Sequence, residues 1–262
     1  MGDVWAVAGG YEAYVGRWSR PVAAEFVRWL GVPAGGRWLD AGCGTGALTG
    51  TVVAAASPAG VTGLDMSTGF LAEARRGAGG QASFVAGDAA ALPFASGRFD
   101  AVVSGLALNF VPGPSRAVAE FARVAAPGGT VAAYVWDYTD GMRMMRYFWD
   151  AALEVDPAAA DQDEGPRFPI CKPGALAQAW ADAGLGEIGT RGVEIPTVFA
   201  DFDDYWRPFL GGQGAAPAYL MRLPPEQREA IRARLDARLP RRPDGSIAMT
   251  ARAWAVRGQA PR

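Results

Sequence analysis

The feature that most constrains this chain of 262 residues is a glycine-rich turn directly after a short apolar run. The segment reads WLDAGCGTG, so the run ends in the carboxylate of Asp40 and glycines follow at Gly42, Gly44 and Gly46. Glycine allows positive φ angles and lets a ligand approach the backbone closely. A helix that begins after such a turn presents unpaired N–H groups. The pattern predicts a strand, a turn and a helix, with a ligand at the carboxyl end of the strand.

Short apolar runs alternate with helical patterns up to Trp136, which is typical of a parallel sheet covered by helices on both faces. The predicted strands are Arg37–Ala41, Gly60–Asp65, Ser83–Gly87, Phe99–Ser104 and Gly129–Trp136. Predicted helices lie between them at Ala47–Ala56, at the segment from the N-cap Ser67 to Arg76, and at Ser115–Ala125.

After Trp136 the rhythm changes. Helices are predicted at Gly141–Val155, Pro173–Ala183 and Pro224–Leu239, with a loop at Asp156–Pro169, a mixed aromatic and glycine segment at Asp201–Pro217, and strands at Glu187–Phe199 and Ile247–Val256. We predict an α/β, Rossmann-like fold with a seven-stranded, mostly parallel sheet whose last strand is an antiparallel insert. The chain is expected to form one domain: 1–36 cover the ligand, 37–136 form the core, 137–246 contribute cap segments and a late strand, and 247–257 supply the last strand.

Composition removes several classes of function. The chain has no histidine, which excludes an imidazole base, a histidine-containing triad and a histidine-ligated metal, and no metal is expected. Two cysteines are too few for a disulfide framework, which favours a reducing cytoplasm. The stretch Ala41–Leu64 is uncharged but too rich in glycine and Ser/Thr for a membrane span, and Met1–Gly10 has no signal-peptide pattern. A sequence pI near 5.3 gives no electrostatic footprint for nucleic acid.

Two further acids follow the glycine turn at the spacing of strand–helix units. Asp65 ends the second predicted strand, about 20 residues past the glycines, where a carboxylate can accept hydrogen bonds from ribose hydroxyls. Asp88 ends the third and can reach the edge of a base. Three strand-terminal acids beside a glycine turn therefore indicate a nucleoside-containing ligand.

The segments WLDAGCGTG, GLDMS, GDAAALPF, FDAVVSGLALNFVP and PGGTVAAYVW occur in this order, and the chain from Tyr11 to Trp136 resembles the class I S-adenosylmethionine-dependent methyltransferases. The likeness is to the small-molecule branch that includes ubiquinone/menaquinone methylases. The later segments VWDYTDGM, FDDYWRPFLGG and ARAWAVRG resemble a bacterial branch of that family, which supports the fold and names no substrate.

The resemblance implies S-adenosylmethionine as the cofactor and assigns the site residue by residue. Asp40 and the Gly42–Gly46 backbone would hold the methionine end, Asp65 the ribose and Asp88 the adenine amino group. The implied cofactor-binding residues are Tyr11, Tyr14, Arg17, Asp40, Ala41, Gly42, Gly44, Gly46, Asp65, Met66, Asp88, Ala89, Ser104, Gly105 and Leu106. Of these, Met66 would pack on the adenine, Ala89 would back it, and Ser104 to Leu106 would line the sulfonium.

Two other functions remain open. A nicotinamide dehydrogenase would explain the G-x-G-x-x-A pattern of Gly42, Gly44 and Ala47, but the chain lacks a histidine proton donor, and Phe168 stands where a Tyr/Lys pair with Lys172 would need tyrosine. A non-catalytic module that binds S-adenosylmethionine or S-adenosylhomocysteine would share the same motifs. Methyl transfer to a small molecule is the preferred interpretation.

The acceptor side is less defined by the sequence. Aromatic residues follow the core strands, and we predict that Asp137–Asp140 and Asp201–Leu210 help to cap an acceptor pocket. The candidate pocket residues are Asn109, Trp136, Tyr205 and Trp206, and any base would be Asp137 or Tyr138, which follow the fifth strand. An oxygen, nitrogen or carbon nucleophile fits equally well, and the enzyme is expected to be a monomer or homodimer.

Overall fold

The computed structural model of the protein describes residues 12–212 and 214–262. The chain divides into two compact units, each built from separate stretches of sequence. We call the unit formed by Ser19–Val135, Ile170–Val193 and Ala253–Arg262 the sheet unit, and the unit formed by residues up to Trp18, Trp136–Pro169 and Glu194–Arg252 the aromatic unit. The expectation of a single domain remains a prediction.

The sheet has seven strands in the order β3-β2-β1-β4-β5-β7-β6. The strands are β1 (Arg37–Ala41), β2 (Gly60–Asp65), β3 (Ser83–Ala86), β4 (Phe99–Gly105), β5 (Ala125–Trp136), β6 (Gly186–Phe199) and β7 (Ile247–Gln259). The first five pair in parallel. Ala260 N donates to Gly129 O, and Asp137 N donates to Arg252 O, so β7 runs antiparallel to β5. The predicted seven-stranded sheet with an antiparallel last strand is confirmed.

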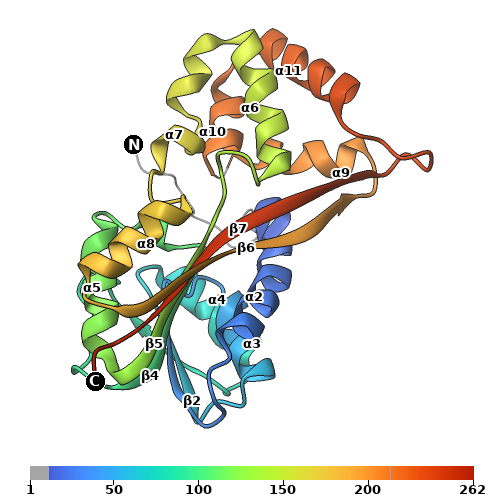
Figure 1. Ribbon diagram of the computed structural model, residues 1–262. Helices are drawn as coiled ribbons and strands as arrows, with labels where there is room; N and C mark the ends of the chain where they lie inside the picture. Colours follow the sequence, from blue (N-terminus) through green and yellow to red (C-terminus); the bar gives the residue numbers. More distant parts are fainter. Residues whose placement is uncertain (1–11, 213) are drawn as a thin grey trace. The chain divides into compact units, whose positions relative to one another are not determined.

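Helices cover both faces of this sheet (Figure 1). One face carries α2 (Arg17–Leu30), α3 (Ala47–Ala55) and α4 (Thr68–Ala78), and the other carries α5 (Pro114–Val124) and α8 (Pro173–Asp182). The predicted cap of α4 is present, because Ser67 Oγ accepts from Phe70 N at 3.2 Å. On the second face, Trp180 Nε1 donates to Val131 O at 2.9 Å and so ties α8 to β5.

Among the predicted strands, the boundary that differs most from the prediction is the start of β5. The helix α5 ends at Val124, and β5 begins at Ala125, four residues before the predicted strand. Ala125 already pairs with Phe99 of β4, ahead of an irregularity between Phe99 and Ala101. The early pairing allows the Pro127-Gly128-Gly129 segment to lie inside the strand, although turn chemistry alone marks it as a break.

The aromatic unit contains several short helices and two longer ones of 13 and 14 residues. Its elements are η1 (Glu12–Gly16), α6 (Arg143–Val155), η3 (Pro157–Asp161), α7 (Glu164–Arg167), α9 (Phe202–Trp206), η4 (Arg207–Gly211), α10 (Ala215–Arg222) and α11 (Pro225–Arg238). The predicted loop Asp156–Pro169 is wrong, since it holds η3 and α7. Asp156 and Asp163 cap these turns, their carboxylates accepting from Ala158 N and Gly165 N at 3.0 and 2.9 Å.

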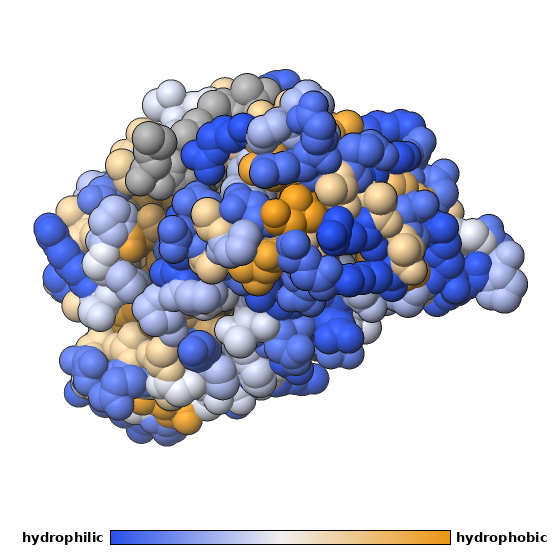
Figure 2. Space-filling model, turned by 90° about the horizontal axis from the view of Figure 1, so that it is seen from above, coloured by the Kyte–Doolittle hydropathy of each residue, from blue (hydrophilic) through white to orange (hydrophobic). Residues whose placement is uncertain are grey.

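Aromatic rings form the interior of this unit. Phe148 of α6 stacks on Phe209 of η4 with centroids 4.6 Å apart, and the rings of Tyr14 and Tyr205 approach Phe209 at 5.2 and 5.3 Å. Seen from above, the molecular surface is mostly hydrophilic, with apolar residues in small separate groups (Figure 2). Within residues 12–212 and 214–262, no helix has the length and apolar character needed to cross a membrane.

Candidate functional site

The glycine turn after β1 has the backbone conformation that its sequence requires. Gly42, Gly44 and Gly46 have φ angles of 77°, 53° and 89°, in the left-handed region that favours glycine. Gly42 N and Cys43 N donate to Leu64 O at 2.7 and 2.9 Å, which fixes the turn to β2. A Cβ on Gly42 would lie 2.6 Å from that of Ala107, whereas one on Gly44 would meet nothing within 4 Å. Gly42 is therefore needed for packing, and Gly44 borders open space.

Asp40 lies at the end of β1 and is fully buried. Its Oδ2 accepts from Thr49 Oγ1 at 2.7 Å, while Oδ1 has no hydrogen-bond partner among the described residues. Burial raises the pKa of Asp40 to about 7. A buried acceptor without a partner is costly, and a cationic group would satisfy it. This orphaned oxygen suits the ammonium group of a methionine moiety.

Asp65 holds the glycine turn from the side of β2. Its Oδ2 accepts from Gly44 N at 2.9 Å and its Oδ1 from Ser67 N at 2.8 Å. Each carboxylate oxygen has a second lone pair, so both can still accept from hydroxyl groups. The side chain of the next residue, Met66, is 72% exposed, which leaves an apolar surface beside the carboxylate.

Asp88 follows β3, and its Oδ1 accepts from Ala90 N at 2.8 Å. Its neighbour Ala89 is buried. Because Asp65 pairs with Ala86 across β2 and β3, Asp88 lies at the same carboxyl edge of the sheet. The structure thus brings the three predicted acids to one edge.

The end of β4 completes this edge. Ser104 is buried, and Leu106 has a φ of 59°, which is rare for a residue with a Cβ and is found at functional sites. Leu106 N donates to Tyr134 O at 2.8 Å. Asn109 lies three residues further on and is 8% exposed, and neither of its amide atoms has a partner in the described part of the chain.

Cys43 lies within the turn but is not a nucleophile. It is buried, and burial raises the pKa of its thiol, so that the group stays protonated. A Cβ on Gly63 of β2 would lie 2.9 Å from its Sγ. Cys43 therefore packs as a small buried side chain against β2.

Tyr14 and Arg17, two of the residues predicted in the amino-terminal segment, belong to the aromatic unit. Tyr11 lies outside the described residues, and Tyr14 is buried with its ring against Phe209. Arg17 donates to both oxygens of Asp204, at 2.8 and 3.2 Å, and to Val198 O at 3.0 Å. Its guanidinium also lies 4.5 and 4.8 Å from the ring centres of Trp18 and Phe199. These contacts indicate that Arg17 positions its own segment, and a direct contact with the cofactor would require breaking them.

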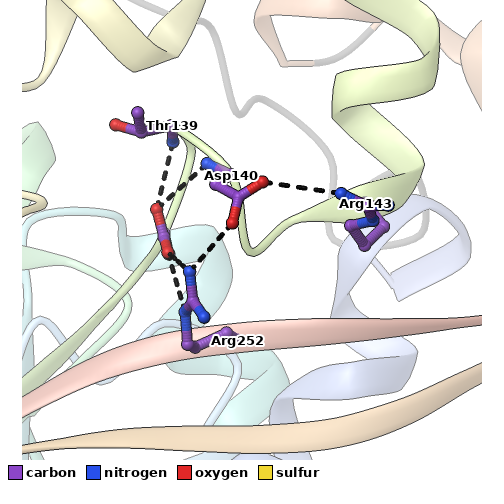
Figure 3. A network of polar contacts seen from close by, with 5 residues as sticks. Thr139, Asp140, Arg143 and Arg252 are labelled. Atoms are coloured by element: carbon purple, nitrogen blue, oxygen red, sulfur yellow. Dashed lines mark hydrogen bonds and ion pairs between the residues drawn. The ribbon is translucent and has the colours of Figure 1, made fainter.

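Asp137 is not placed to act as a base. Its Oδ1 accepts from Thr139 N and Asp140 N at 3.2 Å, and its Oδ2 accepts from Arg252 Nε and Nη2 at 2.9 and 2.7 Å. Figure 3 shows this network, in which Arg252 also reaches Asp140. Each carboxylate oxygen thus accepts from two donors, which commits the side chain to these contacts. The prediction of Asp137 as a base is therefore corrected to a structural role, while Tyr138 is buried with its ring 5.7 Å from Phe168.

The other predicted acceptor residues are buried in the aromatic unit. Tyr205 is fully buried and its hydroxyl donates to Met144 O at 2.8 Å, so packing accounts for it. Trp206 stacks on Phe202 with nearly parallel rings. Trp136 Nε1 is buried and has no partner among the described residues. The acceptor-facing role of Trp136 and Trp206 stays a prediction.

Several structurally important residues carried no sequence signal. Tyr134 looks like an ordinary residue of a buried strand, and Arg252 like a polar residue on an alternating one. Their partners, Gly105 and Asp137, are 29 and 115 positions away, and only strand pairing reveals them. Among the described residues, no group of three or more Cys, Asp or Glu side chains could hold a metal ion.

Comparisons with known proteins agree with this geometry. A family model described as a methyltransferase domain matches residues 39–133. The demethylmenaquinone methyltransferase of Renibacterium salmoninarum is 32% identical over 166 residues, which cover 63% of this chain and 67% of that protein. The ubiquinone/menaquinone biosynthesis C-methyltransferase UbiE of Methylobacterium nodulans is 33% identical over 172 residues, covering 59% of this chain and 68% of that protein. Other relatives are matched over about half of their length.

A solved structure supports the fold. The YcgJ protein of Bacillus subtilis matches with a TM-score of 0.61 and 17% identity, over 92% of this chain and 99% of that one. S-adenosylmethionine is the cofactor of the matched family, and the dehydrogenase and the non-catalytic module are both disfavoured. The chain belongs to the class I S-adenosylmethionine-dependent methyltransferases, in the ubiquinone/menaquinone-methylase-like branch.

Proposed function

We propose that this methyltransferase acts on a small-molecule acceptor and holds its cofactor at the carboxyl edge of the sheet unit. The orphaned oxygen of Asp40 carries this proposal, because a buried anion of this kind needs a cationic partner. Asp40 would bind the ammonium group, Asp65 the ribose hydroxyls and Asp88 the adenine amino group. Met66 would cover the adenine face and Ala89 would back it.

S-adenosylmethionine supplies a methyl group already activated by its positive sulfur, so that the acceptor's lone pair forms the new bond while the carbon–sulfur pair stays on sulfur. The protein's task is alignment and exclusion of water. The chain has no histidine, and the carboxylate oxygens of Asp137 already accept hydrogen bonds from their neighbours. The acceptor's proton would therefore pass to water.

The relatives named above suggest the acceptor class. Their names refer to quinones and quinone precursors, and we propose a hydroxylated aromatic ring as the acceptor. Asn109 supports this choice, because its amide offers a donor and an acceptor to a ring that carries hydroxyl or carbonyl groups. The arginines of α11 give little support for nucleic acid, since Arg238 and Arg234 pair with Glu154 and Arg232 with Glu229.

The cofactor placement can be tested by titration calorimetry with S-adenosylhomocysteine. The Asp65→Ala variant should bind at least about tenfold more weakly than the wild type, because it loses both the ribose acceptor and the support of Gly44. Asp100→Ala, which removes an exposed partner of Arg37 at the amino end of β4, should bind normally. Equal binding by the Asp65 variant and the wild type would contradict the placement.

A test of the proposed acceptor class requires a measurement of turnover. We expect the wild type to form S-adenosylhomocysteine with a water-soluble quinol such as menadiol, and not with primary amines or carboxylic acids of similar size. Asn109→Leu should lower kcat/KM for the quinol by about tenfold, while the affinity for S-adenosylhomocysteine stays unchanged. Turnover of an amine or carboxylate with no turnover of the quinol would contradict this class.

A further inference from the structure

The ring of Tyr134 lies across the neighbouring strand. Tyr134 of β5 pairs with Gly105 of β4, and a Cβ built on Gly105 would lie 2.6 Å from the Tyr134 hydroxyl oxygen. The same Cβ would lie 2.8 and 3.0 Å from Cζ and Cε1, so the polar end of the ring is the part closest to it. The hydroxyl oxygen therefore lies beside the backbone of β4, in space that any side chain at position 105 would occupy.

This position is rigid. Tyr134 is 1% exposed, and its ring packs against Phe26 of α2 with centroids 4.6 Å apart. Its carbonyl accepts from Leu106 N at 2.8 Å, which fixes the backbone on both sides of the contact. The oxygen is thus held in place in a region shielded from bulk water.

The location is the point at which the strand order reverses. In the sheet, β2 lies on one side of β1, and β4 lies on the other side. Val103 pairs with Asp40, and continuing this register places Gly105 level with Gly42 of the glycine turn. In open α/β sheets, ligands bind in the crevice outside the carboxyl ends of the strands at this reversal. The Tyr134 oxygen is therefore positioned at the methionine end of the proposed cofactor site.

We propose that the Tyr134 hydroxyl oxygen contacts the methyl group of bound S-adenosylmethionine. The inference rests on the proposed cofactor placement. A methyl group on a positively charged sulfur has polarised C–H bonds, which donate weakly to an oxygen lone pair. S-adenosylhomocysteine has neither this methyl group nor the charge, so the contact distinguishes donor from product. The tyrosine would orient the methyl group without exchanging a proton.

Calorimetry with both ligands tests the contact without an acceptor. Tyr134→Phe should weaken S-adenosylmethionine binding by about two- to fivefold and leave S-adenosylhomocysteine binding unchanged. Tyr219→Phe is the matched control, because the Tyr219 hydroxyl donates to Asp156 in the aromatic unit, and its ratio of the two affinities should equal that of the wild type. Unchanged binding of both ligands by Tyr134→Phe, or equal weakening of both, would overturn the proposal.

A second measurement uses the wild type and does not depend on the variant's folding. The protons of a ¹³C-labelled methyl group should shift downfield when S-adenosylmethionine binds, as expected for a hydrogen next to oxygen. An upfield shift would indicate that the ring face covers the methyl group and would also overturn the contact. If the wild type binds neither ligand, the cofactor placement fails, which is distinct from failure of the Tyr134 contact.

Discussion

Asp40 combines full burial with a pKa of about 7, and this combination predicts how cofactor affinity responds to pH. A nearby ammonium group favours the ionised carboxylate, so binding must drive a proton off Asp40 when the pH is below 7. Affinity for S-adenosylhomocysteine should be level from pH 7.5 to 8 and fall by up to about tenfold per unit as the pH decreases below 7. Calorimetry in buffers of different ionisation heat would measure both the affinity and the proton released.

Two variants separate this effect from other titrations. Asp40→Asn should bind more weakly at pH 8 and lose the pH dependence between 5.5 and 8. The hydrogen bond from Thr49 to Asp40 Oδ2 lowers the pKa of that carboxyl. Thr49→Val removes this bond, so it should raise the pKa and move the midpoint of the affinity curve to higher pH. If the pH midpoint of the affinity is the same in the wild type and both variants, the pH dependence belongs to a group other than Asp40.

Asp40 should also make the stability of the protein depend on pH, in the direction opposite to that found for most carboxylates. Its folded-state pKa of about 7 lies above the ordinary value of 3.8, so the folded protein holds the proton more tightly. The ligand-free protein should therefore lose stability as the pH rises from about 4 to about 7, by up to about 4 kcal/mol. Denaturation curves for Asp40→Asn should lack this loss.

The glycine turn allows packing and ligand access to be tested separately. Gly44→Ala places a Cβ in open space at a φ of 53°, so it should cost only about 1 kcal/mol of unfolding free energy but weaken S-adenosylhomocysteine binding by about tenfold or more. Gly42→Ala should cost about 3 kcal/mol, because its Cβ would clash with Ala107. Urea denaturation and calorimetry would measure the two quantities.

Gly50→Ala is a suitable control for this pair. Gly50 lies in α3 with nothing within 4 Å of its added Cβ, and the substitution should raise stability by about 0.5–1 kcal/mol without changing affinity. Normal binding by Gly44→Ala would show that the ligand does not approach the backbone there.

At this scale, local pattern predicts Asp40, Asp65 and Asp88 correctly as strand-terminal acids, because strand ends and turns are encoded by neighbouring residues. It could not predict the left-handed Leu106 or the reach of Tyr134 over Gly105. Both arise from the packing of β4 against β5 and β1, which no local spacing reports.

Among the elements, the carboxyl end of β5 is joined to the middle of β7 by the Asp137–Arg252 ion pair. The Asp137 side chain is 4% exposed, so removing its partner leaves a buried charge. Arg252→Met should cost about 3 kcal/mol of unfolding free energy, while Asp137→Asn combined with Arg252→Met should recover part of that loss. Chemical denaturation of the two single variants and the double variant would measure the coupling.

Arg143→Met supplies the control, since Arg143 makes only an exposed contact with Asp140 in this network and should change stability by less than about 1 kcal/mol. Equal, additive losses in the Asp137 and Arg252 variants would argue against a buried coupled pair.

Element existence follows sequence periodicity where helices are long and amphipathic. The helices α5, α6 and α11 were predicted within two residues at each end. The short elements η3, α7, α9, η4 and α10 were not, because each has too few turns to show a 3.6-residue period. Three of them, η3, α7 and α9, begin after an Asp cap (Asp156, Asp163 and Asp201), and these caps were the available signal.

For the whole molecule, each compact unit is assembled from separate segments of the chain, and β6 and β7 contribute residues to both. The composition and alternation of the sequence predict the sheet but not this division. The division depends on the path of β6 and β7, which becomes visible only when their contacts are known.

A chain that ends at Ser246 tests how far the units depend on β7. Without β7, both β5 and β6 lose their shared neighbour, and Asp137 loses Arg252. We expect this truncated protein to unfold at least about 4 kcal/mol more easily, or to lack a cooperative transition, in thermal and urea melts. A melt like that of the full chain would show that β7 is dispensable.

The place of β7 also sets an order of events during synthesis. Of the seven strands it is the last to leave the ribosome, yet it lies between β5 and β6, which are made before it. Until then, the growing chain exposes two strand edges that will later be paired, and such edges invite association with other chains. Conversion of the nascent polypeptide into an enzyme is therefore expected to be a late step, during which chaperones would shield β5 and β6.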